Sequence, residues 1–248
     1  MSQKYIGGFI TKSPTAPSGP YETSTAKGVW TLDQALNYKK QGIWPTAGNV
    51  APPTVIGQAY GGGFYAGQIG VSSTATHYII VGPVASAQSF IFWKNANTAT
   101  AGADSVIDGP QNTADIVADG NSTVYPAAHF CNDLVIGGYS DWYLPAKNEL
   151  EVCYYNLKPT TQSNNTSYGI NANAVPARAS NYTSGNPAQT TATNFKSTGA
   201  EDFSTSPYWA STEFSATRAW SPTFYNGAQY DSNKASSNYV RAIRRVAV

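Results

Sequence analysis

The chain has 248 residues, of which 41% are hydrophobic and only 12% charged, and its formal net charge is +1. Soluble proteins carry about 25% charged residues, so this chain owes its polarity mainly to uncharged side chains. The near-neutral charge argues against a nucleic-acid-binding protein, which needs many Lys and Arg side chains against phosphates. An aromatic content of 13% argues against a disordered chain.

The first residues, MSQKYIGG, lack the apolar core of a signal peptide. The most apolar stretch, residues 78–93, is interrupted by Gly82 and Pro83, which excludes a membrane helix. We therefore expect a protein that is made in a cytosol, is not exported by the usual route and does not insert into a membrane. Cys131 and Cys153 cannot build a disulfide framework, and we expect both to be small buried apolar residues.

Residues 1–50, here called the leader, differ in character from the rest of the chain. Residues 13–20 contain three prolines, which fix backbone angles and remove hydrogen-bond donors, so we expect an extended strap. One short helix is predicted after it, capped by Thr31 with Gln34 as its capping-box partner and ended by Gly42.

Large apolar side chains lie on and beside this predicted helix, with little chain nearby to cover them. Because so short a helix is marginal in water by itself, we expect it to dock on another surface. That surface belongs either to a partner or to the chain's own C-terminal domain. The predicted attachment residues are Trp30, Leu32, Leu36 and Trp44.

From residue 51 the pattern changes to short strands separated by turn residues. The glycines at 61–63 predict a tight turn rather than a phosphate loop, because neither the Lys-Ser/Thr pair nor a helix pattern follows them. Residues 78–81 and 89–93 are rich in β-forming side chains, and we expect them to be neighbouring strands.

Two helices are predicted in the middle of the domain. The first starts at Pro126 and is ended by Gly137 and Gly138. The second covers residues 146–157 and places Leu150, Cys153 or Tyr154, and Leu157 on one apolar stripe. Residues 160–207 show little periodicity and predict a long loop region, a feature that is usually functional or mobile in compact domains.

The C-terminal residues give the clearest β pattern. Residues 208–212 begin it, and residues 218–225 lead into Asn226-Gly227, a pair typical of a type I′ hairpin turn. Residues 239–246 predict a final strand with alternating faces. Together the elements predict an α+β fold, in which an antiparallel sheet has two helices packed on one side and carries long loops.

The segment DWYLPAKNEL at residues 141–150 resembles a motif of the Lcl-like C-terminal domain of bacterial surface and phage tail proteins, Asp-Trp-Arg-Leu-Pro-x-x-x-Glu-Leu. Tyr143 stands here in place of the usual Arg. Later segments follow the family's order and spacing: YWASTE at 208–213, AW at 219–220, NG at 226–227 and VRAIR at 240–244. The resemblance covers roughly residues 55–248 and implies a C-type-lectin-like fold for a display domain at residues 51–248.

A second resemblance concerns the leader. Its segments IGG, GVWTLDQ and GIWP, at residues 6–8, 28–34 and 42–45, are similar to N-terminal modules of marine and cyanobacterial phage virion proteins. In that group the module precedes unrelated C-terminal domains. The resemblance therefore implies an attachment role for the leader.

The sequence offers little catalytic or metal-binding chemistry. His77 and His129 have no metal-ligand spacing, and His129 is expected to be structural. Acidic residues of the kind that calcium prefers occur in one predicted loop stretch, without the spacing of a dedicated site: Asp104, Asp108, Asp115 and Asp119. We expect no enzyme activity, no cofactor and no metal.

One enzymatic alternative remains. The C-type-lectin-like fold is shared with the formylglycine-generating enzymes, oxidases that use a pair of active-site cysteines. Here Cys131 and Cys153 lie on the two predicted helices rather than in the late loop region, where that chemistry would take place. This oxidase is therefore the remote alternative.

Tyrosines among Ser, Asn and Gln near the C-terminus predict a recognition surface, since rigid aromatic area combined with adaptable hydrogen bonding is typical of such surfaces. Trp209 and Trp220 are expected in the core. The predicted receptor or partner surface consists of Tyr225, Asn226, Gln229, Tyr230, Asp231, Asn233 and Lys234.

The basic cluster of Arg241, Arg244 and Arg245 has two interpretations. It contacts an anionic surface, or its members pack on aromatic rings and pair with Glu213 or Asp231. We favour the second interpretation. Residues 141–142 are likewise interpreted as a structural corner rather than as a site.

These observations predict a non-enzymatic phage virion protein of the tail-fibre or adhesin type, made in the host cytoplasm. The leader anchors it, and a lectin-like domain is displayed for host receptor binding. The alternative is a purely structural collar, baseplate or capsid-decorating protein. Expected partners are other virion proteins and a host cell-surface glycan or protein, with the chain itself forming a homo-oligomer, taken as a trimer.

Overall fold

The computed structural model describes residues 15–17, 19, 26, 29–44 and 51–248. The chain divides into two compact units, Met1–Pro52 and Pro53–Val248. From here on they are called the leader and the C-terminal domain. The leader segment IGG, part of the predicted strap and Pro45 lie outside the described residues. Within the described ranges, no helix is long and apolar enough to cross a bilayer.

In the described part of the leader, helix α1 (Leu32–Lys40) forms where the capping pattern predicts it. The Thr31 hydroxyl accepts a hydrogen bond from the Gln34 amide (3.2 Å), and the Gln34 side chain accepts one from the Thr31 amide (2.9 Å). These two bonds complete the capping box. The helix is followed by Gly42 at φ +72°, a left-handed conformation that glycine adopts without steric cost.

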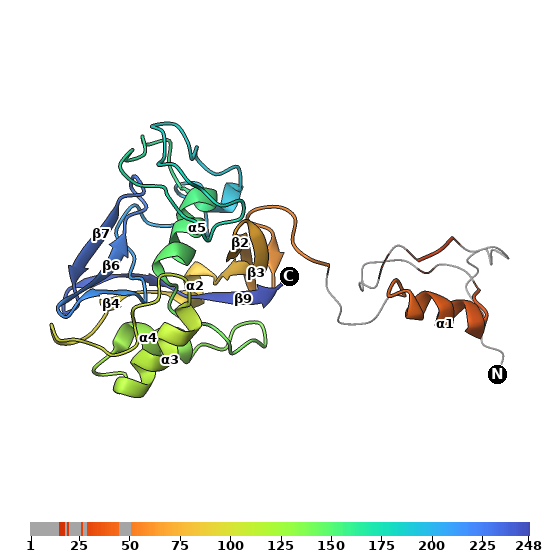
Figure 1. Ribbon diagram of the computed structural model, residues 1–248, viewed down its shortest axis with the longest axis horizontal. Coiled ribbons are helices and arrows are strands. Elements are labelled where there is room, and N and C mark those ends of the chain that lie inside the picture. The colour runs from red at the N-terminus through yellow and green to blue at the C-terminus, as the bar shows by residue number, and fades with distance from the viewer. Residues whose placement is uncertain (1–14, 18, 20–25, 27–28, 45–50) are drawn as a thin grey trace. The chain divides into compact units, whose positions relative to one another are not determined.

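A four-stranded antiparallel sheet joins the first strands of the C-terminal domain to the last one (Figure 1). Its strands are, in spatial order, β1 (Ala59–Tyr60), β2 (Gly63–Val71), β3 (Thr74–Val81) and β9 (Ile243–Ala247). Gly61 and Gly62 make the predicted tight turn, with φ of +56° and +82°. β9 is an outer strand of this sheet.

The remaining strands form two smaller antiparallel sheets, so the prediction of one sheet is wrong. One consists of β4 (Gln88–Phe92) and β8 (Ser237–Arg241), and the other of β5 (Glu213–Ser215), β6 (Arg218–Pro222) and β7 (Gln229–Asn233). β3 and β4 are not neighbours, because Gly82, Pro83 and the short helix α2 (Val84–Ala87) carry the chain from one sheet to another.

The predicted final strand is two strands, β8 and β9, in different sheets. Ala242 separates them: its amide donates to the Ala87 carbonyl and its carbonyl accepts from the Gly82 amide, both at 2.9 Å. The expected alternation of faces is absent here, since residues 240–244 are all buried between the sheets. Residues 208–212 are not a strand, and Tyr208 makes an isolated bridge to Tyr239.

The β6–β7 hairpin forms as predicted, but its turn is not of type I′. Among residues 223–228, all of which the structure describes, only Gly227 has a positive φ (+77°), whereas a type I′ turn needs positive φ at both central residues. The Asn226 side chain instead accepts a hydrogen bond from the Ala228 amide (3.1 Å). The loop between β6 and β7 is therefore longer than the two-residue turn that Asn-Gly predicts.

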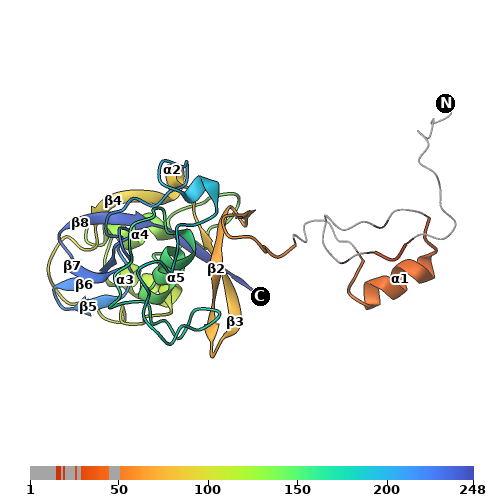
Figure 2. The ribbon, with the colours of Figure 1, turned by 90° about the horizontal axis from the view of Figure 1, so that it is seen from above.

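Helix α5 (Lys147–Leu157) lies between the β1–β2–β3–β9 sheet and the β5–β6–β7 sheet in both views (Figures 1 and 2). Its predicted stripe of Leu150, Cys153 and Leu157 is buried. Helix α4 (Pro126–Asn132) starts at the predicted residue but ends earlier than Gly137 and Gly138 suggest.

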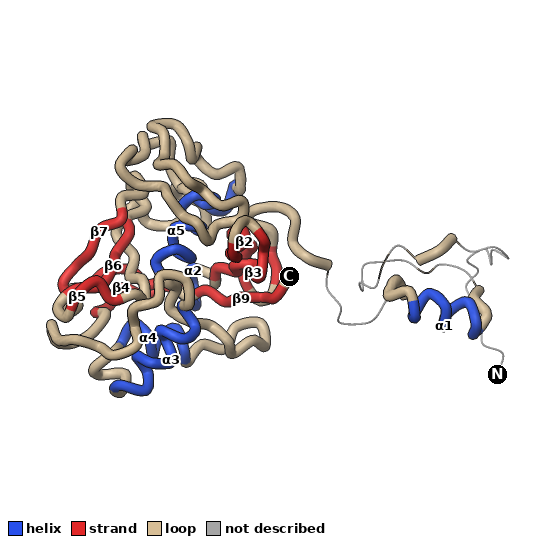
Figure 3. Tube along the Cα trace, in the orientation of Figure 1, coloured by secondary structure: helices blue, strands red, loops and turns tan. Residues whose placement is uncertain are grey.

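Helix α3 (Gly109–Asp119) forms in a stretch that the prediction treats as a loop. Asp108 caps it by accepting from the Gln111 amide (3.4 Å), and Pro110 occupies its first turn. Residues 160–207 form the predicted long loop region, interrupted by the short 3-10 helix η1 (Thr193–Phe195), and gather beside one end of α5 (Figure 3). The domain is thus a mixed, antiparallel α and β structure with few helices, compatible with the α+β prediction.

Candidate functional site

The motif segment forms a corner, here residues 139–146, that is tied to β9. Arg244 donates from Nε and Nη2 to the two carboxylate oxygens of Asp141, at 2.7 and 2.8 Å, and its guanidinium lies 3.8 Å from the centre of the Tyr139 ring. Trp142 is buried and its indole N–H donates to the Tyr139 carbonyl (3.1 Å). These contacts give Asp141 and Trp142 the structural role that the sequence suggests.

Glu149, at the start of α5, is fully buried at the centre of this corner. Its carboxylate accepts from the Tyr143 hydroxyl (2.5 Å), the Arg245 Nε (2.6 Å) and the Ala146 and Gly109 amides (2.8 and 3.2 Å). Burial raises the pKa of the Glu149 carboxyl, and the Arg245 guanidinium opposes that shift. One carboxylate thus joins α3, the corner, α5 and β9.

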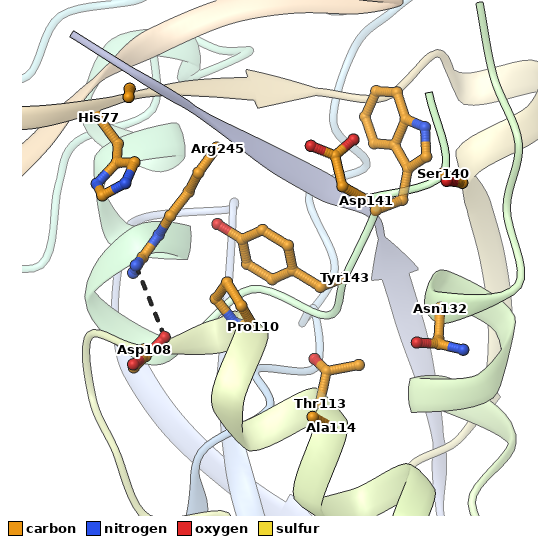
Figure 4. A pocket seen from close by; sticks show the side chains of 12 residues that line it. His77, Asp108, Pro110, Thr113, Ala114, Asn132, Ser140, Asp141, Tyr143 and Arg245 are labelled. Atoms are coloured by element: carbon orange, nitrogen blue, oxygen red, sulfur yellow. Dashed lines mark ion pairs between the residues drawn. The ribbon is translucent and has the colours of Figure 1, made fainter. Parts of the chain in front are cut away.

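A cavity of about 510 Å³ opens in front of the corner, between α3, β3 and β9 (Figure 4). The Arg245 Nη1 lies 3.7 Å from a half-exposed carboxylate oxygen of Asp108, and His77 lies beside Arg245. Burial lowers the pKa of the His77 imidazole, the charge of Arg245 lowers it further, and Asp108 acts in the opposite direction. The cavity is therefore polar, lined by an imidazole, a guanidinium and a half-exposed carboxylate.

The β6–β7 hairpin carries the residues predicted to form a recognition surface, and the structure divides them. Tyr225 and Tyr230 are 49% and 48% exposed, and Asn233 is exposed as well, whereas Asn226 and Asp231 are half-buried. Asp231 forms an ion pair with Arg218. The exposed tyrosines and Asn233 remain candidates for contact with a partner.

Gln229 and Lys234 are buried, so placing them on that surface is wrong. The Lys234 ammonium donates to the Glu213 carboxylate (2.6 Å) and to the carbonyls of Thr98 and Ala216 (2.8 and 3.0 Å). It therefore holds an earlier loop against the hairpin. The position of Gln229 and Lys234 near the predicted hairpin turn suggests that they are exposed. Nothing near them in the sequence shows the carboxylate and carbonyl groups that bind Lys234.

Two buried charges on and after α5 hold the long loop region, and the sequence reasoning missed both. Glu151 forms an ion pair with Arg178 and accepts from the Tyr182 hydroxyl and the Asn171 side-chain amide, each at 2.5 Å. Its place next to Leu150 gives no signal, since successive helix residues point about 100° apart. Its partners lie in the distant loop region, where the sequence does not show them.

The second buried charge is Lys158. Its ammonium donates to the Gln162 carbonyl (2.5 Å), the Asn164 side chain (2.7 Å) and the Pro187 carbonyl (3.2 Å). These acceptors are neutral and belong to separate parts of the loop region. The loops are thus fixed from the end of α5.

The predicted attachment residues of the leader fall into two pairs. Trp30 and Trp44 are half-buried and meet edge to face, with ring centroids 5.6 Å apart, and Trp30 also packs edge to face on Tyr38. Leu32 and Leu36 are 75% and 44% exposed, and α1 buries none of its residues. The tryptophans therefore support the helix, and the leucines are available for contact.

Cys131, Cys153 and His129 behave as structural residues. Cys131 and Cys153 are free, buried and in different core clusters, and burial raises the pKa of both thiols. The His129 Nε2 lies 2.7 Å from the Gly120 carbonyl oxygen, in agreement with its predicted structural role.

The acidic side chains at residues 104–119 do not converge on one point. Asp108 caps α3, Asp115 accepts from the Gln111 side chain (2.9 Å), and Asp119 accepts from the Tyr125 hydroxyl. Because the stretch is a helix rather than a loop, these side chains are used separately. Within the ranges that the structure describes, no group of three or more His, Cys, Asp or Glu side chains could hold a metal ion.

The three arginines near the C-terminus form ion pairs within the chain, as the favoured interpretation predicts. Their partners are not the predicted Glu213 and Asp231. Arg241 pairs with Glu201 at 2.9 Å, while Arg244 and Arg245 pair with the corner and with Glu149. The predicted partner Glu213 is taken by Lys234. Long-range pairs of this kind depend on topology, which the sequence does not show.

A family model of the Lcl C-terminal domain matches residues 84–244. The chain therefore belongs to the Lcl C-terminal domain family. No match to a curated protein is found. The matched span includes the corner, α5, the long loops and the hairpin, while Arg245, which supplies the guanidinium beside Glu149, directly follows it. Tyr143, where the motif usually has Arg, binds the same carboxylate.

Proposed function

We propose that the chain is a non-enzymatic phage virion component, attached by its leader and presenting its C-terminal domain for recognition. The observation that carries this proposal is the exposure of Leu32 and Leu36 on a helix that buries none of its residues. Burying a leucine side chain contributes roughly 1.5–3 kcal/mol, so a partner that covers both gains substantially. The family's occurrence in surface and tail proteins supports the same role.

The proposed recognition surface is the outer part of the β6–β7 hairpin, with Tyr225 and Tyr230 as its aromatic anchors. The hairpin rests on stacked rings, since Phe224 lies parallel to Phe203 with centroids 4.0 Å apart. Exposed tyrosine and asparagine on a rigid support suit a surface that binds a host glycan or protein. A tail-fibre or adhesin role follows, and a homo-oligomer, taken as a trimer, is part of this proposal.

A C-type-lectin-like fold is part of the same proposal. It is supported by the pairing of the first strands of the domain with its last strand, and by the long loops held on a compact base. The formylglycine-generating oxidase remains the remote alternative. Two buried thiols in separate core clusters disfavour it, because a reactive cysteine needs access and a stabilised thiolate.

The attachment role is tested with Leu32→Glu in the full chain, introduced into the virus. We expect the variant to fold normally but to be absent from purified particles, because the new carboxylate cannot be buried against a partner. Asn37→Glu adds the same charge on another exposed position of α1 and serves as the matched control. Normal incorporation of the Leu32 variant would contradict the role of α1.

The recognition role is tested by measuring binding of the full chain and its Tyr230→Ala variant to host cells. We expect at least about a fivefold loss of affinity, as for an aromatic residue at an interface. Phe90→Ala removes another exposed ring, on β4, and is the matched control. If the folded wild-type chain does not bind host cells, the alternative of a purely structural collar, baseplate or capsid-decorating protein is favoured.

A further inference from the structure

The outer edge of β9 is only partly paired. Tyr143 of the corner pairs with Ile243 through both backbone hydrogen bonds, at 2.9 and 3.1 Å. Beyond that bridge, no strand or bridge in the described part of the chain covers this edge. The following residues of β9 therefore lack a strand partner on this side in the described part of the chain.

The register of β9 shows which backbone groups point outward. The hydrogen bond from the Val248 amide to the Thr76 carbonyl (3.1 Å) marks the even-numbered residues as those that face β3. Ile243, an odd-numbered residue, turns the other way, toward the corner. Arg245 and Ala247 consequently direct their N–H and C=O groups to the open edge, at the two-residue repeat that strand pairing requires.

The open edge borders the 510 Å³ cavity. Arg245 lines it on one side, and Pro110 and Ala114 of α3 line it on the other (Figure 4). Ala247 of β9 is also among its lining residues. A cavity of this volume is within the range of ligand sites, about 300–1,000 Å³. A wall of unpaired backbone groups suits an extended peptide, which pairs with a sheet edge along its main chain.

The charges around the cavity favour a basic side chain in that peptide. The Arg245 guanidinium is engaged by Glu149 and by the Ile107 carbonyl, and Asp141 is engaged by Arg244. Asp108 is half-exposed, and its nearest cation lies 3.7 Å away. Its carboxylate is thus the least compensated charge at the cavity.

We propose that β9 binds an extended segment of a partner protein as an added strand, with a Lys or Arg side chain of that segment paired to Asp108. The site is separate from the exposed tyrosines of the hairpin and from α1, so it goes beyond the proposed function. It gives the C-terminal domain a second way to contact a neighbouring protein.

The test uses isotope-labelled full-length protein and a capped hexapeptide of alternating Lys and Val, followed by NMR. We expect slowed amide exchange and shift changes at Arg245 and Ala247. Ala247→Pro removes an outward N–H without removing a hydrogen bond to β3, so the protein should keep its stability and lose at least about tenfold in affinity. Asp108→Asn should weaken binding about two- to fivefold, and Asp115→Asn, on the same helix but outside this cavity, should not.

Several outcomes would overturn the proposal. One is absence of binding by both this hexapeptide and a mixed library of basic hexapeptides at about 1 mM. Another is equal binding of a peptide N-methylated at alternate amides, which cannot pair as a strand. A third is that a panel of saccharides, and not the peptides, shifts the cavity residues. In each case the failure leaves the tests of α1 and Tyr230 unaffected.

Discussion

Helix α1 of the leader and helix α5 of the C-terminal domain distribute their side chains in opposite ways. α1 leaves two leucines exposed, whereas α5 buries two glutamates completely or almost completely. Water disfavours exposed apolar area, and a buried carboxylate is costly unless it is hydrogen-bonded. The exposed leucines support the proposal that the leader contacts another surface, while the buried charges of α5 hold the fold of the C-terminal domain.

The substitution with the largest expected effect on stability is Glu149→Ala. We expect the C-terminal domain to lose about 3–5 kcal/mol of unfolding free energy, because the change leaves Arg245 and two backbone amides without their buried acceptor. Urea denaturation measures it. Asp104→Ala, at an exposed position, is the control and should stay within about 0.5 kcal/mol of wild type. If Glu149→Ala changed the unfolding free energy as little as Asp104→Ala, the structural role of Glu149 would be contradicted.

A smaller effect is expected from Lys158→Met. The variant keeps the length of the side chain but removes the three hydrogen bonds that the buried ammonium donates, which costs about 1–3 kcal/mol. Because the acceptors of these bonds belong to the loop region, limited proteolysis should cut residues 160–207 faster than in wild type. Unchanged cleavage there, with lower overall stability, would show that Lys158 supports the core and not the loops.

The smallest effect concerns pH and His77. Burial and Arg245 lower the pKa of His77 below its ordinary value of 6.5, so the unfolded chain binds the proton more readily. The contribution of His77 to stability is therefore complete above about pH 6.5 and is lost as the pH falls toward the lowered pKa. In urea titrations below about pH 6.5, wild type should lose more stability than His77→Gln. Identical pH dependence of the two would place His77 outside the charged surroundings of the cavity.

Local patterns were sufficient to predict several elements correctly. The capping box of α1, the glycine turn before β2, the start of α4 and the stripe of α5 all depend on neighbouring residues, and each is confirmed. α3 is not predicted because the face that it buries consists mainly of small or polar residues, namely Gly109, Asn112, Thr113 and Ile116. Its cap, Asp108 before Pro110, was the available signal.

Long-range features could not be predicted in the same way. The division into separate sheets depends on where Pro83 and Ala242 redirect the chain, and the pairing of β9 with β3 joins residues far apart in the sequence. The burial of Lys234 follows from carbonyl groups of a distant loop. The cavity is lined by residues of β3, α3, the corner and β9, which lie far apart in the sequence.

The most direct test of the central claim is electron microscopy of the intact particle. The account predicts that α1 is covered by another virion protein, with Leu32 and Leu36 in the contact, and that the C-terminal domain projects from the particle with Tyr225 and Tyr230 accessible. A leader exposed to solvent, or a particle without this chain, would contradict it.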